Sequence, residues 1–239
     1  MLRLRVGSLF GRLGECQKRT FKKYPFPVTF ENVVFPPNGK MKLPTMPSEP
    51  TYNPELGEEP YKTSHRLIEA RGPEEIHTEL IHNQFGLAAV NGGFLGANHL
   101  KMLEERVNKN LREKQFAIWR VEEPWLPRTK KSQGARLGGG KGRIKRYVTP
   151  VRSGRIILEV GGYIIEPEAR SFLCYLADLL PMKAEFVSAE ILQQRREEEE
   201  YIRRENANRF DWDMVMRYNM QNCTSWLSSY DLHWRGKFK

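Results

Sequence analysis

Ten positively charged side chains stand in one stretch of the sequence, between residues 128 and 155, and they are suited to binding phosphate. The cations are Arg128, Lys130, Lys131, Arg136, Lys141, Arg143, Lys145, Arg146, Arg152 and Arg155, and no Asp or Glu interrupts them. Their net charge of +10 equals that of the whole 239-residue chain, so the remaining residues sum to zero. Charge concentrated in this way releases counterions from a phosphate backbone. It favours a nucleic-acid partner over a solvated basic loop.

A glycine-rich segment lies within this stretch, and its glycines are Gly134, Gly138, Gly139, Gly140 and Gly142. Glycine permits close backbone approach to a ligand. A phosphate-binding P-loop is excluded, because Ala135 occupies the place of its first Gly and Lys141 is followed by Gly142 instead of Ser or Thr. The dinucleotide-binding pattern fails as well, since a basic strand and not a helix follows. We expect a cationic loop that reaches into folded RNA; the alternative is a flexible hairpin tip without a partner.

No other group of residues has the spacing of a catalytic or metal site. His77 and His82 are five apart, one residue too many for a shared helical face. Three widely separated cysteines predict neither a disulfide framework nor a zinc site. Glu122-Glu123 and the Glu166/Glu168 pair are interpreted as solvated charges. We therefore expect no catalytic residue, no metal and no cofactor.

The pattern around the cationic stretch predicts a compact α+β domain. Leu100, Leu103, Val107 and Leu111 form an apolar stripe of helical period within 97–114, and a second helix follows Pro167 and stops at Pro181. Strands are predicted over 116–121, 144–151, 155–160 and 183–187. Trp119 is expected in the core, with stacking on a base as the alternative. The expected fold is an antiparallel or mixed sheet with two helices packed on one face.

The flanking segments differ in composition from this domain. Residues 1–23 are rich in Arg, nearly free of acids and amphipathic, as in a mitochondrial transit peptide. Residues 24–82 comprise a proline-rich extended segment, with a short strand expected near 28–35, and a linker with a helix start at Pro73. The domain is expected over 83–188. Residues 189–239 are expected to form a charged helix and an aromatic tail that docks on another surface. No apolar window approaches the length of a membrane span.

Several blocks between Phe85 and Val187 resemble the universal large-subunit ribosomal protein family numbered sixteen in bacteria, in its mitochondrial form. They are Phe85–Ala89, the helix from Ala97 to Arg112, Ile118–Val121, the loop Arg136–Gly142, Leu158–Gly162 and Leu180–Lys183. The blocks occur in the family's order and cover a little under half of the chain. Two loop positions depart from the bacterial pattern: Gly139 stands where Lys is typical and Leu137 where Met is typical.

The resemblance implies a structural constituent of the mitochondrial large ribosomal subunit, located in the matrix, which performs no chemistry. The domain would grip the large-subunit ribosomal RNA, and the loop residues Arg136, Gly138, Gly139, Gly140, Lys141 and Gly142 would lie near the aminoacyl-site tRNA and the peptidyl-transferase region. Arg143, Lys145 and Arg146 would clamp rRNA. The two extensions would meet neighbouring mitochondrial ribosomal proteins.

Two other functions stay open from the sequence alone. One is a mitochondrial RNA-binding factor that does not reside in the ribosome. The other is a phosphate-binding enzyme that uses the glycine-rich loop, although neither nucleotide-binding pattern is matched. Sedimentation with the large subunit distinguishes the first from the ribosomal role, and nucleotide binding by the purified protein distinguishes the second.

Overall fold

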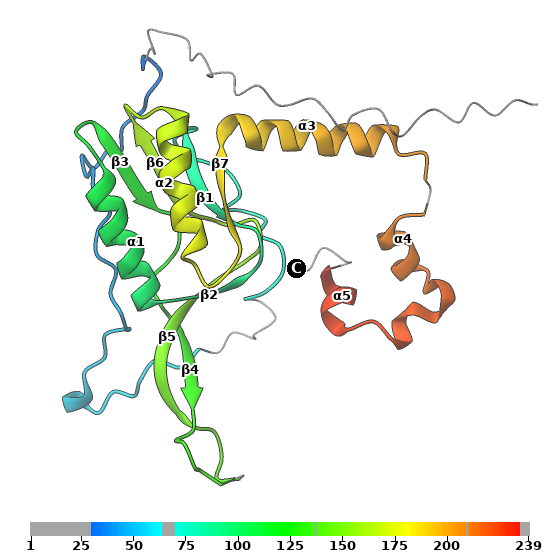
Figure 1. Cartoon of the computed structure of the whole chain (residues 1–239). Coiled ribbons are helices and arrows are strands. Elements are labelled where there is room, and N and C mark those ends of the chain that lie inside the picture. Colours follow the sequence, from blue (N-terminus) through cyan, green and yellow to red (C-terminus); the bar gives the residue numbers. More distant parts are fainter. Residues whose placement is uncertain (1–29, 64–69, 137, 209, 235–239) are drawn as a thin grey trace, which may run out of the picture. The chain divides into compact units, whose positions relative to one another are not determined.

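The computed structural model describes residues 30–63, 70–136, 138–208 and 210–234, and the expected transit peptide lies outside them. Figure 1 shows helices and strands intermixed along the chain. In chain order they are the 3-10 helix η1 (Pro54–Leu56), β1 (Phe85–Ala89), β2 (Gly93–Gly96), α1 (Ala97–Asn110), β3 (Gln115–Trp119), β4 (Leu126–Lys130), β5 (Arg143–Val151), β6 (Ile156–Gly162), α2 (Glu166–Asp178), β7 (Ala184–Ser188), α3 (Ala189–Glu205), α4 (Trp212–Arg217), the 3-10 helix η2 (Met220–Ser225) and α5 (Ser229–Trp234).

A four-stranded antiparallel sheet forms the centre of the domain, with strand order β3-β6-β1-β7. All seven residues of β6 are buried. Apart from Glu159 they are apolar or glycine, which suits a central strand whose two faces are both covered. Leu158 of β6 stands opposite Leu87 of β1, and the register shifts at the next residue, Ala88.

Helices α1 and α2 cover one face of this sheet (Figure 1). Leu100, Leu103 and Val107 form the buried stripe of α1, as the helical period predicts. The buried residues of α2 are Ala169, Leu173, Leu176 and Ala177. They share one core cluster with Leu87, Leu158 and Val160 of the sheet. The fold class predicted from the sequence, α+β with two helices on one face of a sheet, is confirmed.

The proline-rich segment contributes to the same core without forming a helix or strand between residues 32 and 53. Leu43 is buried, and its backbone is held by Asn108 of α1, which accepts from the Leu43 N–H at 2.8 Å and donates to its carbonyl at 3.0 Å. Trp119 is half-buried against the core, and its Nε1 donates to the Pro44 carbonyl at 2.8 Å. Trp119 thus has the core position expected of it.

The opposite face of the sheet is covered by the segment before β1. Leu80 packs with Ala88, Ile156 and Val187 in a second, smaller cluster. Glu159 of β6 is buried between them and the segment, and its carboxylate accepts from the backbone N–H groups of Ile81 and His82. Arg120 lies 2.9 Å from the same carboxylate and compensates its charge. A buried carboxylate requires such partners.

A second antiparallel sheet, in the order β2-β5-β4, corrects the single sheet expected from the sequence. β4 and β2 were missed as separate strands. Each is only four or five residues long and contains Pro or Gly, which weaken a strand pattern. β5 pairs with β2 through its second half and with β4 through most of its length. Its nine residues therefore link the core to a two-stranded hairpin.

Two local predictions were wrong. Residues 30–35 form no strand, and no helix follows Pro73, which instead forms an isolated bridge to Ser153. In both places a long-range contact determined the conformation: Phe35 packs edge-to-face on Phe116, and the Glu74 N–H donates to the Ser153 carbonyl. The charged helix predicted after residue 188 is present as α3. The aromatic tail folds into the short helices α4, η2 and α5.

Candidate nucleic-acid interface

The β4–β5 hairpin places like charges directly across from one another. Arg128 stands opposite Arg146, and Lys130 stands opposite Arg143, with a bulge between the two pairs. Residues directly opposite in an antiparallel pair project to the same face and lie about 5 Å apart, and like charges there are destabilising. A bound polyanion would remove this repulsion.

Eight of the ten predicted cations are exposed on this hairpin and its loop. They are Arg128, Lys130, Lys131, Arg136, Lys141, Arg143, Lys145 and Arg146. No acidic side chain in the described part of the chain forms an ion pair with any of them. The Arg128 guanidinium lies over the Phe94 ring of β2 at 4.7 Å, and Lys131 Nζ donates to the Gly138 carbonyl. For the other six, the described residues provide neither an ion pair nor a ring contact.

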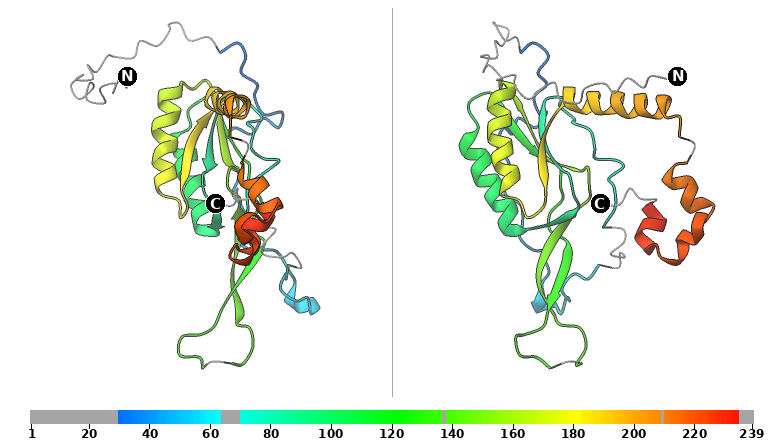
Figure 2. Two further views of the ribbon diagram at one scale, coloured as in Figure 1. Left: turned by 90° about the vertical axis from the view of Figure 1, so that its right-hand side faces the viewer. Right: turned by 45° about the vertical axis from the view of Figure 1, so that its right-hand side comes forward.

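The loop that joins β4 to β5 depends on its glycines for two different reasons (Figure 2). Gly138, Gly139 and Gly140 have φ values of +93°, +67° and +78°, a left-handed conformation that side chains with a Cβ rarely adopt. Space around them is open, so the requirement there is conformational. At Gly142 the requirement is steric, since a Cβ would stand 2.7 Å from the carbonyl carbon of Lys130 across the neck of the hairpin.

The remaining two cations, Arg152 and Arg155, follow the hairpin and are half-buried. Arg155 donates to the Arg120 carbonyl at 3.2 Å, and its Nη1 lies 3.8 Å from the Glu74 carboxylate. The acid-free stretch thus receives an acid from a segment more than fifty residues earlier. Local sequence gives no signal for this pairing, and it separates Arg155 from the exposed set.

The base of the hairpin is tied to two flanking segments of the chain by polar groups of β5. Thr149 is buried and donates to the Glu122 carbonyl at 3.0 Å. Burial raises the pKa of the Tyr147 phenol, and the neighbouring Tyr52 and Glu49 raise it further. The phenol therefore stays protonated at neutral pH, as it must to donate to the Tyr61 carbonyl at 3.1 Å. These bonds position the exposed half of β5 relative to the core.

Other kinds of site find no support in the described residues. No group of three or more His, Cys, Asp or Glu side chains among them converges as a metal site would require. In the same residues, no helix has both the length and the apolar character that crossing a bilayer demands. The described cysteines, Cys174 and Cys223, are free thiols.

Comparison with known proteins identifies a family for most of the domain. The family described as ribosomal protein L16p/L10e matches residues 57–187. The large ribosomal subunit protein uL16 of Salinibacter ruber is 31% identical over 135 residues, which cover 54% of this chain and 92% of that protein. The large ribosomal subunit protein uL16 of Leptospira biflexa is 30% identical over 122 residues, which cover 51% of this chain and 88% of that protein.

Proposed function

This chain belongs to the ribosomal protein L16p/L10e family, and from that premise we propose that it is a mitochondrial form which binds large-subunit rRNA through the β4–β5 hairpin. As a member of the family it is a structural protein of the large ribosomal subunit and not an enzyme. Its partners are ribosomal RNA and other ribosomal proteins. The glycine-rich loop would lie near the aminoacyl-site tRNA and the peptidyl-transferase region.

The observation that carries the RNA-binding proposal is the pairing of like charges on the hairpin. Arg128 with Arg146 and Lys130 with Arg143 repel each other across the strands, and no described acid offsets them. Contacts from such side chains would be mostly to phosphate and sugar, so they would position RNA without reading its sequence. Arg136 and Lys141, at the loop, would be the cations nearest to the tRNA.

Support for the mitochondrial form comes from the parts of the chain outside the family match. Residues 1–23 have the composition of a transit peptide, whereas the relatives compared are bacterial. The match ends at residue 187, so α3 and the helices after it are additions to the family pattern. We assign 83–188 as the RNA-binding domain and propose that the segments 24–82 and 189–239 contact neighbouring ribosomal proteins.

Sedimentation of organelle lysate tests the proposal. An epitope-tagged chain should migrate with the large ribosomal subunit through a sucrose gradient at moderate salt, and it should leave that fraction when the subunit is dissolved by ribonuclease. A chain that stays at the top of the gradient in untreated lysate would instead be an RNA-binding factor outside the ribosome. Retention in mitochondria, with the large subunit, supports both the ribosomal and the mitochondrial part of the assignment.

A further inference from the structure

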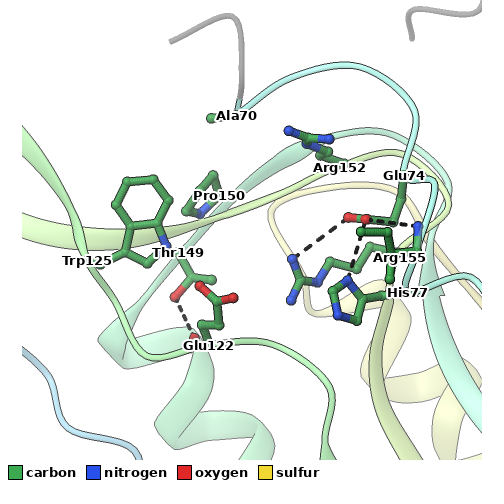
Figure 3. A pocket seen from close by; sticks show the side chains of 10 residues that line it. Ala70, Glu74, His77, Glu122, Trp125, Thr149, Pro150, Arg152 and Arg155 are labelled. Atoms are coloured by element: carbon green, nitrogen blue, oxygen red, sulfur yellow. Dashed lines mark hydrogen bonds and ion pairs between the residues drawn. The ribbon is translucent and has the colours of Figure 1, made fainter. Parts of the chain in front are cut away.

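A cavity of about 440 Å³ lies at the root of the cationic hairpin, outside the residues assigned to phosphate contacts above. Figure 3 shows its lining, which comes from three separate parts of the chain. Glu74 and His77 belong to the segment before β1, and Trp125 precedes β4. Arg152 and Arg155 follow β5. Because these residues are far apart in the sequence, no contiguous motif predicts the site.

One wall of the cavity is polar and incompletely satisfied. The Glu74 side chain is only 6% exposed, and its carboxylate lies 3.8 Å from Arg155 Nη1 and 3.5 Å from His77 Nδ1 (Figure 3). Both His77 Nδ1 and Arg155 Nε are buried and form no hydrogen bond in the described part of the chain. Buried polar atoms without a partner are uncommon in native proteins. Neither atom is exposed to solvent in this structure, so a ligand with hydrogen-bonding atoms of its own would satisfy them after a rotation of the His77 or Arg155 side chain.

The opposite wall combines two apolar residues, Trp125 and Pro150, with two polar ones, Glu122 and Thr149. The indole of Trp125 stands beside Pro150 in Figure 3, and the Glu122 carboxylate lies below it. Trp125 is half-buried and also borders a second cavity, which Tyr61, Glu122 and Glu123 line with it. Aromatic side chains of this kind stack on nucleobases, and every base offers such a face.

The charge of the lining decides which part of a nucleotide would enter. Two carboxylates, Glu74 and Glu122, balance the two guanidinium groups of Arg152 and Arg155. A phosphate would meet both carboxylates at close range, whereas an uncharged base has donors and acceptors that suit such a mixed lining. The phosphates of the same strand would be held outside, along the hairpin, whose strand β5 ends at Val151, one residue before Arg152.

We propose that this cavity receives one unpaired, splayed-out base of the RNA that the hairpin binds, stacked on Trp125 and hydrogen-bonded on the side of Glu74, His77 and Arg155. RNA proteins commonly recognise unstacked bases of loops and bulges in this way. The inference rests on the proposed RNA-binding function, and it adds a site that distinguishes single-stranded from fully paired RNA.

Two RNA stem–loops test the proposal, identical except that one carries a single bulged 2-aminopurine. The full-length protein should bind both with salt-dependent affinity and should change the emission of the bulged analogue by stacking. Trp125→Leu should weaken binding to the bulged RNA by about 5- to 100-fold and leave the fully paired RNA within about twofold. Trp125→Phe should restore most of the preference. Trp226→Leu, which removes an exposed indole in the C-terminal extension, should change neither affinity.

Each result points in one direction. Equal affinity of the wild-type protein for both RNAs, or an equal loss on both RNAs in Trp125→Leu, would overturn the base site while leaving the hairpin's role intact. Absence of salt-dependent binding to either RNA would instead reject the proposed function itself. If Trp125→Leu lowers the thermal stability of the protein, the test uses the wild-type protein alone. Binding should then change the emission of the bulged 2-aminopurine, and free adenosine monophosphate should reverse that change by competing for the cavity. An emission that RNA binding leaves unaltered excludes the site.

Discussion

Single residues in this protein have roles that depend on whether another part of the chain neutralises them. Glu159 is 1% exposed, and its carboxylate is compensated by Arg120 and by two backbone N–H groups of the segment before β1. The sequence predicts Arg155 as one of ten cations available to RNA. In the fold, by contrast, its guanidinium lies beside the Glu74 carboxylate. The sequence therefore gives the charge of a side chain, but only the fold shows whether that side chain is free to contact a ligand.

Replacement of Glu159 by Gln should lower the free energy of unfolding by about 3 kcal/mol, because it leaves the half-buried Arg120 without a counter-charge and gives two N–H donors an amide in place of a carboxylate. Chemical denaturation of the purified protein measures this change. Glu105→Gln is the matched control, since Glu105 pairs at 3.9 Å with Lys101 on the exposed side of α1 and should cost less than about 0.5 kcal/mol. Equal effects of the two substitutions would contradict the structural role of Glu159.

At the scale of elements, strand β5 of the β4–β5 hairpin has a buried half that pairs within the domain and an exposed half that carries cations. The second half of β5 is buried and pairs with β2, and the first half carries Arg143, Lys145 and Arg146 into solvent. Tyr147 and Thr149 tie the buried half to the backbone carbonyls of Tyr61 and Glu122 by hydrogen bonds. The exposed half is thus continuous with a buried half that is held by strand pairing and hydrogen bonds.

Replacement of Arg143, Lys145 and Arg146 together by Gln should lower affinity for large-subunit rRNA fragments and reduce the slope of log K against log salt by about 2 to 3, because each cation that neutralises a phosphate releases counterions. Titrations at several salt concentrations measure the slope. The control variant carries Lys40→Gln, Lys101→Gln and Lys109→Gln, which remove the same charge from exposed positions elsewhere. A slope that both variants share would assign the binding to total charge and not to the hairpin.

The loop should behave differently from the strand that carries it. Replacement of Arg136 and Lys141 together by Ala is expected to impair tRNA accommodation more than subunit assembly, because these residues lie at the loop and away from the anchored half of β5. Ribosome profiles and translation rates of the same cells separate the two effects. Normal translation in this double variant would contradict the proposal that the loop lies near the aminoacyl-site tRNA.

The whole molecule combines a family domain with segments that the family match does not include. Residues 57–187 match the family, and α3 begins directly after β7 with the side chain of Ser188 accepting from the Ile191 N–H. None of the residues of α3 is buried. Its first turn packs against the core through Ala189, Ile191 and Leu192, but the rest of the helix has little apolar contact and is marginal by itself in water, so we expect a neighbouring protein to stabilise it.

Residues 1–23 are expected to direct the whole chain to mitochondria. A fluorescent protein that carries this segment at its N-terminus should enter the organelle, and the full chain without it should not, because the arginine-rich, acid-poor composition is that of a transit peptide. Microscopy and protease protection measure the outcome. The control replaces Arg3, Arg5 and Arg12 by Ala. Import that does not depend on the segment or on its arginines would contradict the mitochondrial assignment.

The sequence by itself determined whatever depends on local period and local charge. The stripe of α1, the helix that follows Pro167, the strand now seen as β5 and the ten-cation stretch were all readable, because each repeats within a few residues. Only the tertiary structure decided what depends on distant segments. It divided the strands between two sheets, paired Arg155 with Glu74 and joined Trp125 to His77 around one cavity. Contacts between residues that lie far apart in the chain leave no periodic trace in a single sequence, since they are set by how the buried faces pack.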